Sequence, residues 1–406
     1  MKQNIKKVAL AYSGGLDTSI IIPWLKDNYK CEVIAVTINV GQKDDPEKLE
    51  KKAIESGASK FYWVDAESEF IIDYVFPTLK AGAIYEGKYL LGTSMARPLQ
   101  AKKQIEIALN EKADALSHGC TGKGNDQVRF ELTYKSFAPN LKVIAPWREW
   151  NITTREEAID YAEKHDIPLS GISKKNIYSR DKNIWHLSHE GGELEDTVNR
   201  PLENMFQLSI SPEKAPDKVT EVEIEFDKSI PVAVNSKKLP PVQLLSLLNN
   251  LGGQNGIGRA DIVETRLVGM KSRGVYETPG GTILAKALRE LEMLCMDGES
   301  LNFKLELSYR YAQLVYNGKW FSPLKNALDN CIAELTKNVT GKIKLGLYKG
   351  NIIILSRQSP CSLYNEKLAS FSDSEVYDQK NATGFINLYG LSTYVMSQLN
   401  DKEEEN

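Results

Sequence analysis

Two glycines and three hydroxyl side chains lie close together near the N-terminus, in Ser13-Gly14-Gly15-Leu16-Asp17-Thr18-Ser19. An apolar run, VALAY, precedes them and IIIPWLKDNY follows, which predicts a strand, a tight turn and a helix. Backbone N–H groups converge at the start of such a helix and the hydroxyls add donors, so the segment suits an anion. A capped glycine turn is the plainer interpretation of an isolated Ser-Gly-Gly. The position after the first strand favours the anion site, because ligands of open α/β sheets bind at the carboxyl ends of strands.

Two common nucleotide-binding patterns do not fit. The G-x-x-x-x-G-K-[ST] pattern fails at this turn and again at Gly122-Lys123, where Gly124 follows. The G-x-G-x-x-G pattern fails at the first turn as well, so kinase-like transfer and dinucleotide binding lose support. The SGGLDTS segment resembles instead the pyrophosphate loop of the N-type ATP pyrophosphatases, which cleave ATP between the α- and β-phosphates. That resemblance implies AMP and pyrophosphate as products.

The elements around this loop predict an α/β domain over residues 1–168. Helix-like stretches alternate with five apolar runs, KKVALAY, CEVIAVT, KFYWVDA, ADALSHG and KVIAPW. This alternation predicts a parallel, Rossmann-like sheet with helices on both faces. Pro46 in a first turn and Gly57 as a C-cap predict a helix over about 46–56, and the capping box at Thr154 predicts another.

The remaining chain predicts an α+β domain over residues 169–360 and a C-terminal arm over 361–406. Residues 170–215 are polar and predict a connector made of loops. Beyond them, TEVEIEF and DIVETRLV predict strands, PPVQLLSLLNNLGG and TILAKALRELEMLCMDG predict helices, and KIKLGLYKGNIIILSR predicts a hairpin turning at 349–351. In the arm, GFINLYGLSTYVMSQL predicts one apolar helix that docks on another subunit.

Composition narrows the class of protein. A formal charge of -3 over 406 residues provides no basic field for nucleic acid or an anionic membrane. No apolar stretch is long enough to span a bilayer, and the N-terminus lacks the apolar core of a signal peptide. Five scattered cysteines without a C-x-x-C pair favour reduced thiols and the cytoplasm. His186 and His189 lack a third ligand, so we expect local packing roles for them and no transition-metal site.

Seven further segments resemble the argininosuccinate synthase family, in the family's order and over essentially the whole chain. They are EGKYLLGTSMARP (86–98), HGCTGKGNDQVRFEL (118–132), APWREW (145–150), EGGELED (190–196), DIVETRLVGMKSRGVYETPGGT (261–282), LYKGN (347–351) and YDQKNATGFI (377–386). The resemblance implies a cytoplasmic, homotetrameric ligase of arginine biosynthesis. Such an enzyme uses ATP with Mg²⁺ to adenylate the ureido oxygen of citrulline and joins the activated carbon to aspartate, releasing AMP and pyrophosphate.

Two other kinds of protein would share this loop. A transfer-RNA-modifying pyrophosphatase should carry a basic face, and the thiolases among them commonly carry paired cysteines; this chain is slightly acidic and has no such pair. A non-catalytic ATP-binding sensor should be a short chain, whereas a second domain with its own polar clusters follows here. Both alternatives are therefore disfavoured.

The resemblance also implies which residues contact each substrate. ATP contacts are Ala11, Tyr12, Ser13, Gly14, Gly15, Leu16, Asp17, Thr18, Ser19, Ile38 and Gly119. Citrulline contacts are Tyr89, Ser94, Asn125, Arg129, Ser179, Ser188, Glu264 and Tyr276, and aspartate contacts are Thr121, Asn125 and Asp126. The planar guanidinium of Arg129 suits a carboxylate and Glu264 suits an ammonium. Each serine or tyrosine could equally be a turn or core residue.

Two positions depart from what we expect of the family. Ile38 lies where smaller residues are common, so only a main-chain contact carries over. Cys120 lies where we expect Ala, and its alkylation should slow the enzyme, with protection by aspartate. Asp17 has two interpretations: a carboxylate near the metal, or an acid in the first turn of the helix that the helix dipole stabilises. No proton acceptor is identified.

Overall fold

The computed structural model describes residues 5–152, 154–168, 178–370 and 377–404, without the side chains of Arg155 and of 401–404. The chain divides into a compact unit, Met1–Cys361, and a short C-terminal unit, Ser362–Asn406. Within the described residues, no helix has the length and apolar character needed to cross a membrane.

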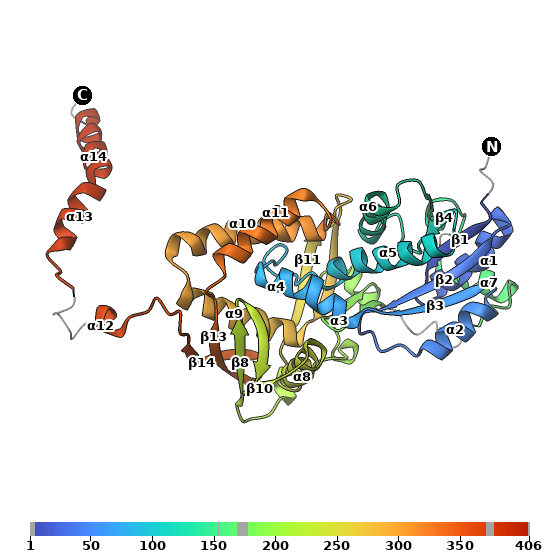
Figure 1. The fold of residues 1–406 in the computed structure, drawn as a ribbon, viewed down its shortest axis with the longest axis horizontal. Helices are drawn as coiled ribbons and strands as arrows, with labels where there is room; N and C mark the ends of the chain where they lie inside the picture. The colour runs from blue at the N-terminus through green and yellow to red at the C-terminus, as the bar shows by residue number, and fades with distance from the viewer. Residues whose placement is uncertain (1–4, 153, 169–177, 371–376, 405–406) are drawn as a thin grey trace. The chain divides into compact units, whose positions relative to one another are not determined.

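The N-terminal half of the first unit is built on the predicted parallel sheet (Figure 1). Its strand order is β3-β2-β1-β4-β5, with β1 (Lys7–Ala11), β2 (Glu32–Asn39), β3 (Lys60–Asp65), β4 (Ala115–Ser117) and β5 (Lys142–Ile144). The chain leaves β1 toward β2 on one side and later returns to β4 on the other. The strand order therefore reverses between β1 and β4, which is where open α/β sheets bind ligands.

Helices cover both faces of this sheet, as the alternation predicted. Val8 and Leu10 of β1 pack with Ile22 and Leu25 of α1 on one face, whereas Ala9 belongs to the cluster that contains Leu99 of α5 on the other. The helices are α1 (Leu16–Tyr29), α2 (Pro46–Glu55), α5 (Gly92–Asn110), α6 (Asp126–Phe137) and α7 (Arg155–Lys164).

The two predicted helix signals are found with one small correction. Thr154 forms a capping box with Glu157 at the start of α7. In α2 the C-cap is Ser56, one residue earlier than expected, and Gly57 follows it with a φ of +102°. Glycine adopts this φ without strain, so Gly57 is the first residue after the C-cap of α2 and not the C-cap itself.

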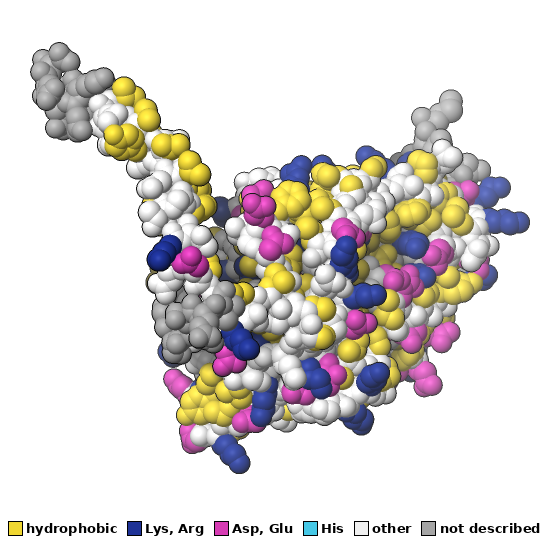
Figure 2. Space-filling model, turned by 60° about the vertical axis from the view of Figure 1, so that its left-hand side comes forward, with side chains coloured by type: hydrophobic (Ala, Val, Ile, Leu, Met, Phe, Trp, Pro, Cys, Tyr) yellow, Lys and Arg dark blue, Asp and Glu magenta, His cyan; other side chains and the backbone are white. Residues whose placement is uncertain are grey.

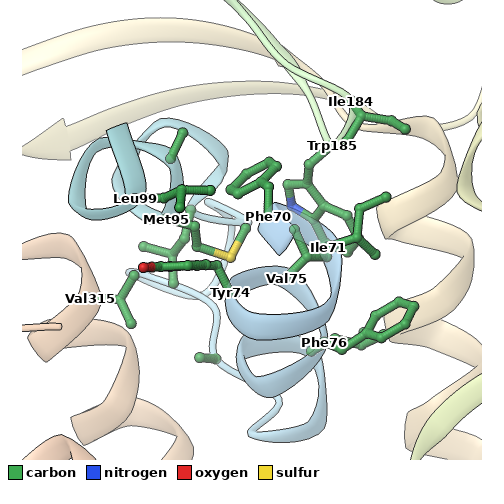
Figure 3. Close-up of a cluster of buried hydrophobic side chains, with 14 of the residues drawn as sticks. Phe70, Ile71, Tyr74, Val75, Phe76, Met95, Leu99, Ile184, Trp185 and Val315 are labelled. Carbon is green, nitrogen blue, oxygen red and sulfur yellow. The ribbon is translucent and has the colours of Figure 1, made fainter. Parts of the chain in front are cut away.

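An apolar core joins this half to the rest of the first unit (Figure 3). A π-helical turn (Phe70–Val75) between α3 (Glu67–Glu69) and α4 (Phe76–Lys80) packs against α5. The cluster drawn includes Met95 of α5 together with Trp185 and Val315 from later in the chain. The indole nitrogen of Trp185 also donates to the carbonyl of Leu90 at 2.8 Å. Because this core is continuous, side chains from both halves can be held against one another.

The second half contains two antiparallel sheets. One has the order β10-β9-β8-β13-β14, with β8 (Thr220–Asp227), β9 (Ile230–Val234), β10 (Lys237–Lys238), β13 (Gly341–Tyr348) and β14 (Asn351–Gln358). The other has the order β11-β12-β7-β6, with β6 (Ser179–Lys182), β7 (Leu187–Glu190), β11 (Arg259–Thr265) and β12 (Lys271–Glu277). The helices are α8 (Pro241–Gln254), α9 (Pro279–Cys295), α10 (Gly298–Tyr316) and α11 (Pro323–Leu335).

Most predicted elements of this half are confirmed, including the hairpin that turns at Lys349–Gly350, but the connector over 170–215 is wrong in part. Its described residues contain β6 and β7, which form half of a sheet, and 3₁₀ turns at Gly192–Glu195, Glu203–Met205 and Pro212–Lys214. Another 3₁₀ turn, Pro146–Arg148, follows β5. The strands SRDK and LSHE are polar on both faces, so they lack the apolar alternation that signals a strand.

The C-terminal unit consists of α12 (Glu366–Ala369), α13 (Asn381–Tyr389) and α14 (Leu391–Glu404). The expected single helix is therefore wrong, because the chain forms two helices on either side of Gly390. Large apolar side chains of these helices are exposed, among them Leu388 at 73% and Tyr389 at 80% (Figure 2).

Candidate functional site

A cavity of about 630 Å³ opens at the carboxyl ends of β1, β2 and β4. The segment after β1, the end of β2 and the segment after β4 line one side, and residues of β6, β7, β11 and β12 line the other. The reversal point of the parallel sheet therefore faces the β11-β12-β7-β6 sheet across the cavity.

Most of the residues named by the family resemblance line this cavity. From the ATP set they are Ala11, Tyr12, Ser13, Gly15, Asp17, Thr18, Ile38 and Gly119; from the two amino-acid sets they are Tyr89, Thr121, Asn125, Asp126, Arg129, Ser179, Ser188, Glu264 and Tyr276. Leu16, Ser19 and Ser94 are instead buried, and Gly14 is packed against Leu49. These four residues shape the walls from behind.

The loop between β1 and α1 has the geometry of an anion site. Gly14 has a φ of +72°, and an added Cβ would lie 2.2 Å from Cδ2 of Leu49, so glycine is required on both counts. Gly15 is the N-cap of α1 and provides no side-chain cap. The Ser13 hydroxyl accepts from the Gly15 N–H at 3.4 Å and lies 3.1 Å from Oγ1 of Thr18. The first-turn amides of α1 lack intrahelical partners and point toward the cavity end of the helix.

A chain of alternating charges crosses the end of the cavity that α5, α6 and β6 line. Arg97 of α5 contacts Asp126 of α6 at 2.8 Å and Asp181 of β6 at 2.9 Å. Arg129 contacts the other oxygen of Asp126 at 2.8 Å. Burial opposes ionisation of Asp126, but the two guanidinium groups outweigh it and lower its carboxyl pKa. Asp126 is therefore an anion fully engaged by two arginines, and the chain links both halves of the unit.

Arg129 and Glu264 both line the cavity, and each has a buried polar atom that is left unpaired. Nη2 of Arg129 and Oε2 of Glu264 are buried and have no hydrogen-bond partner among the residues that the structure describes. The other groups of both side chains are occupied: Nε of Arg129 donates to the carbonyl of Tyr316 at 3.0 Å, and the Tyr276 hydroxyl donates to Oε1 of Glu264 at 3.3 Å. Buried polar groups are normally paired, so one donor and one acceptor are left for a ligand.

Burial raises the pKa of Glu264 to about 7, although Arg129 acts in the opposite direction. Glu190 adds to the increase, since its negative charge disfavours a second carboxylate nearby. Burial also raises the pKa of Glu190, which is bound by Arg266 at 2.6 Å. A cation placed between these groups would be favourable.

Hydrogen bonds from the turn between β11 and β12 hold the loop 121–125 in place. The Leu267 N–H donates to Oδ1 of Asn125 at 2.8 Å, and Nδ2 of Asn125 donates to the Tyr316 hydroxyl at 2.9 Å. Arg266 donates to the carbonyl of Lys123 at 3.2 Å. Asn125 thus has a positional role in the loop, and contact with a ligand would use its second amide hydrogen.

The histidines near the cavity are packing residues. The Cys120 N–H donates to Nδ1 of His118 at 3.3 Å, so Nε2 carries the proton and donates to Glu131 at 3.1 Å. Burial lowers the pKa of His118 and of His186 to about 4 in each case, so both are neutral. His189 is buried against Glu277 at 2.9 Å. The packing roles expected for His186 and His189 agree with these contacts.

Several cavity residues were missed by the sequence reasoning. They include Thr37, Gln42, Asp44, Thr93, Arg97, Gln100, His118, Phe130, Arg180, Asp181, Lys182, Glu190 and Arg266. A strand period of two was the available signal for Asp181 and Glu190. The register pairs Ser179 with Glu190 and Asp181 with Ser188, so all four lie on one face. Arg97 has no such signal, because its importance comes from partners distant in sequence.

Comparison with known proteins gives matches along nearly the whole chain. A family model described as "Arginosuccinate synthase N-terminal HUP domain" matches residues 7–168, and one described as "Arginosuccinate synthase C-terminal domain" matches residues 178–396. An argininosuccinate synthase of Caldanaerobacter subterraneus subsp. tengcongensis is 60% identical over 387 residues, covering 95% of this chain and 94% of its own. One of Acetivibrio thermocellus is 57% identical over 400 residues, covering 98% of each chain.

A solved structure described as a predicted subunit of a tRNA methyltransferase from Methanocaldococcus jannaschii covers 39% of this chain and 75% of its own, at 16% identity. Its TM-score of 0.27 is too low to carry an argument. The sequence matches are much stronger evidence, because they include both domain models and extend over almost the full length of each relative. They show that the chain belongs to the argininosuccinate synthase family of ATP-using ligases in arginine biosynthesis.

Proposed function

We propose that this ligase binds ATP with its outer phosphates on residues 11–19, with citrulline and aspartate beside it in the same cavity. The observation that carries the amino-acid assignment is the pair of unsatisfied atoms on Arg129 and Glu264. A zwitterionic α-amino acid has a carboxylate for the first and an ammonium for the second. Tyr89, Asn125, Ser179, Ser188 and Tyr276 complete the citrulline set, with Ser94 buried behind its wall. Thr121, Asn125 and Asp126 form the aspartate set, and Ile38 and Gly119 flank the nucleoside.

The reaction requires positioning more than strong acid–base chemistry. With the β- and γ-phosphates on the loop, the α-phosphorus faces the ureido oxygen of citrulline, and alignment of these atoms lowers the barrier. Helix amides and hydroxyls of the loop stabilise charge on the departing pyrophosphate. The amine of aspartate then attacks the activated carbon and AMP leaves. Neither nitrogen of His118 is available as a base, because both are hydrogen-bonded.

Mg²⁺ bound to the triphosphate would neutralise its charge. The carboxylates of the chain that line the phosphate end of the cavity are Asp17 and Asp44, and carboxylate oxygens are ligands that Mg²⁺ accepts. These two residues are the ones we propose to approach the metal, directly or through water.

We further propose residues 1–168 as the nucleotide-binding domain, 169–360 as the synthetase domain and 361–406 as an arm that assembles a homotetramer. The exposed apolar side chains of α13 and α14 support the assembly role. All five cysteines are free, which is typical of a reducing compartment and supports a cytoplasmic location. Nucleic acid and membranes are not proposed as partners.

One isotope experiment tests the proposal. The enzyme is incubated with ATP, Mg²⁺, aspartate and citrulline labelled with ¹⁸O in the ureido group, and products are followed by mass spectrometry. We expect AMP, pyrophosphate and argininosuccinate in equal amounts, with the label in the phosphate of AMP. Formation of ADP, or AMP without the label, would refute the proposal. A second reaction with transfer RNA in place of citrulline should release no AMP.

A further inference from the structure

A lysine of α2 reaches the back of the loop between β1 and α1. Nζ of Lys52 donates to the carbonyl oxygen of Gly14 at 2.6 Å. The side chain is partly buried, and burial lowers its pKa. Among the described residues, no carboxylate lies within ion-pair distance of Lys52, although its neighbours Lys48 and Lys51 on the same helix both pair with acids.

The bond to Gly14 controls where the next amide points. In a trans peptide the C=O and the following N–H point in opposite directions, so fixing the Gly14 carbonyl toward α2 turns the Gly15 N–H away from α2. That N–H donates to Oγ of Ser13, with 3.4 Å between nitrogen and oxygen, and Ser13 lines the cavity, so the amide points to the cavity side of the loop. Without the lysine, nothing among the described contacts holds this carbonyl, and a rotated peptide would present an oxygen to the phosphates.

The charge of Lys52 also favours an anion on the cavity side of the loop. Among the described residues, the partner of the partly desolvated Lys52 ammonium is a neutral carbonyl, which is unfavourable unless an anion lies close by. Such an anion would sit on the opposite side of the Gly14–Gly15 peptide, in the cavity. The triphosphate of ATP has that charge and that location under the proposed function.

We propose that Lys52 is a positioning residue for the β- and γ-phosphates: it holds the Gly14 carbonyl away from them, directs the Gly15 amide toward them and adds a positive charge behind the loop. The inference rests on the proposed binding of the triphosphate to residues 11–19. It concerns the outer phosphates alone, because Lys52 lies behind the loop and lines no part of the cavity where the amino acids would bind.

The test compares three variants of the full-length enzyme. Lys52→Met removes the charge and the donor, and Lys52→Arg keeps both. Lys51→Met is the matched control, since Lys51 is adjacent on α2, its side chain is 73% exposed, and it pairs with Glu55 of the same helix at 3.8 Å. We measure KM for ATP, KM for citrulline, and the inhibition constants of pyrophosphate and AMP, together with the thermal midpoint of each variant.

Lys52→Met should raise KM for ATP and the inhibition constant of pyrophosphate about tenfold, the usual size of a lost charge-assisted contact. The constants for AMP and citrulline should stay within about twofold of the wild type, because neither ligand has outer phosphates. Lys52→Arg should restore most of the affinity for pyrophosphate, and Lys51→Met should behave as the wild type. Direct calorimetric titration of pyrophosphate into Lys52→Arg gives a second measurement if Lys52→Met is poorly folded.

The possible outcomes distinguish a failure of the role of Lys52 from a failure of the proposed binding of the triphosphate to residues 11–19. Normal pyrophosphate affinity in Lys52→Met, with weakened affinity in Ser13→Ala, overturns the role of Lys52 and leaves the phosphate loop in place. Unchanged pyrophosphate affinity in both variants overturns the proposed binding of the triphosphate itself. Equal losses for AMP, citrulline and pyrophosphate, with a lower thermal midpoint, would assign Lys52 to folding alone.

Discussion

The pKa of Glu264 leads to a quantitative prediction for citrulline binding. In the proposed citrulline site, only the ionised carboxylate of Glu264 would attract the ammonium of citrulline, and burial raises the pKa of Glu264 from 4.5 to about 7. With that pKa the ionised fraction is about a tenth at pH 6 and about nine tenths at pH 8. We therefore expect kcat/KM for citrulline to rise about tenfold between these pH values, because this parameter reports groups of the free enzyme. His118 and His186, with pKa values of about 4, do not titrate in this window.

Glu264→Gln tests the assignment. It should lower kcat/KM for citrulline by about 10- to 100-fold at pH 8, the effect of losing a charged hydrogen bond, and should abolish the rise between pH 6 and 8. Glu190→Gln provides a directional control: Glu190 contributes to the raised pKa, so its neutralisation should shift the rise toward lower pH. A flat profile in the wild-type enzyme, or an unchanged rise in Glu264→Gln, would refute the reasoning.

The same pKa has a consequence for stability. A carboxyl group whose pKa is higher in the folded state favours folding when protonated, and this contribution is lost as pH rises from about 4.5 to about 7. The difference corresponds to about 3 kcal/mol for the substrate-free enzyme. Citrulline should reverse it by supplying a counter-charge, and its binding near pH 6 should release a proton. Calorimetric titration in two buffers of different ionisation enthalpy measures that release.

Three further predictions concern other parts of the chain. Arg97→Met should raise the pKa of Asp126 and weaken aspartate binding at least tenfold, and Arg97→Lys should have a smaller effect. The KM values for the three substrates measure this effect. An effect confined to ATP would contradict the prediction. Cys120 should react slowly with iodoacetamide near neutral pH because burial raises its thiol pKa, and aspartate should slow the reaction further. Mass spectrometry measures the extent of modification. Full activity of the completely modified enzyme would rule out a role for Cys120 beside the aspartate loop. Changing Leu388 and Tyr389 together to Ser should lower the mass of the assembly in light scattering, and an unchanged mass would argue against an interface there.

The parallel sheet and its binding loop could be predicted from local patterns. The apolar runs are long, the helices between them carry start and end signals such as Thr154, and the SGGLDTS turn directly follows the first strand. Each of these features depends on residues close together in sequence. Apolar burial and backbone geometry act at that range, so the pattern is sufficient.

The polar sheet could not be predicted in the same way. Strands β6 and β7 have polar residues on both faces, because one face lines the cavity and the other holds His189 against Glu277. A strand that is stabilised by hydrogen bonds and ion pairs to distant residues has no apolar alternation to read. The prediction of a single C-terminal helix failed for a different reason: the apolar pattern continues across Gly390, where the helix is interrupted for one residue.

What the sequence by itself indicated is the class of chemistry: a turn on a parallel sheet that is expected to bind phosphate and, through the family resemblance, an acid expected to bind an ammonium and an arginine expected to bind a carboxylate. What only the tertiary structure decided is how these groups are charged and occupied. Asp126 is held as an anion between Arg97 and Arg129, Glu264 has a pKa of about 7, and Lys52 lies behind the loop with no acidic partner among the described residues. Charge state depends on burial and on neighbours that approach from other elements, and neither is encoded in local spacing.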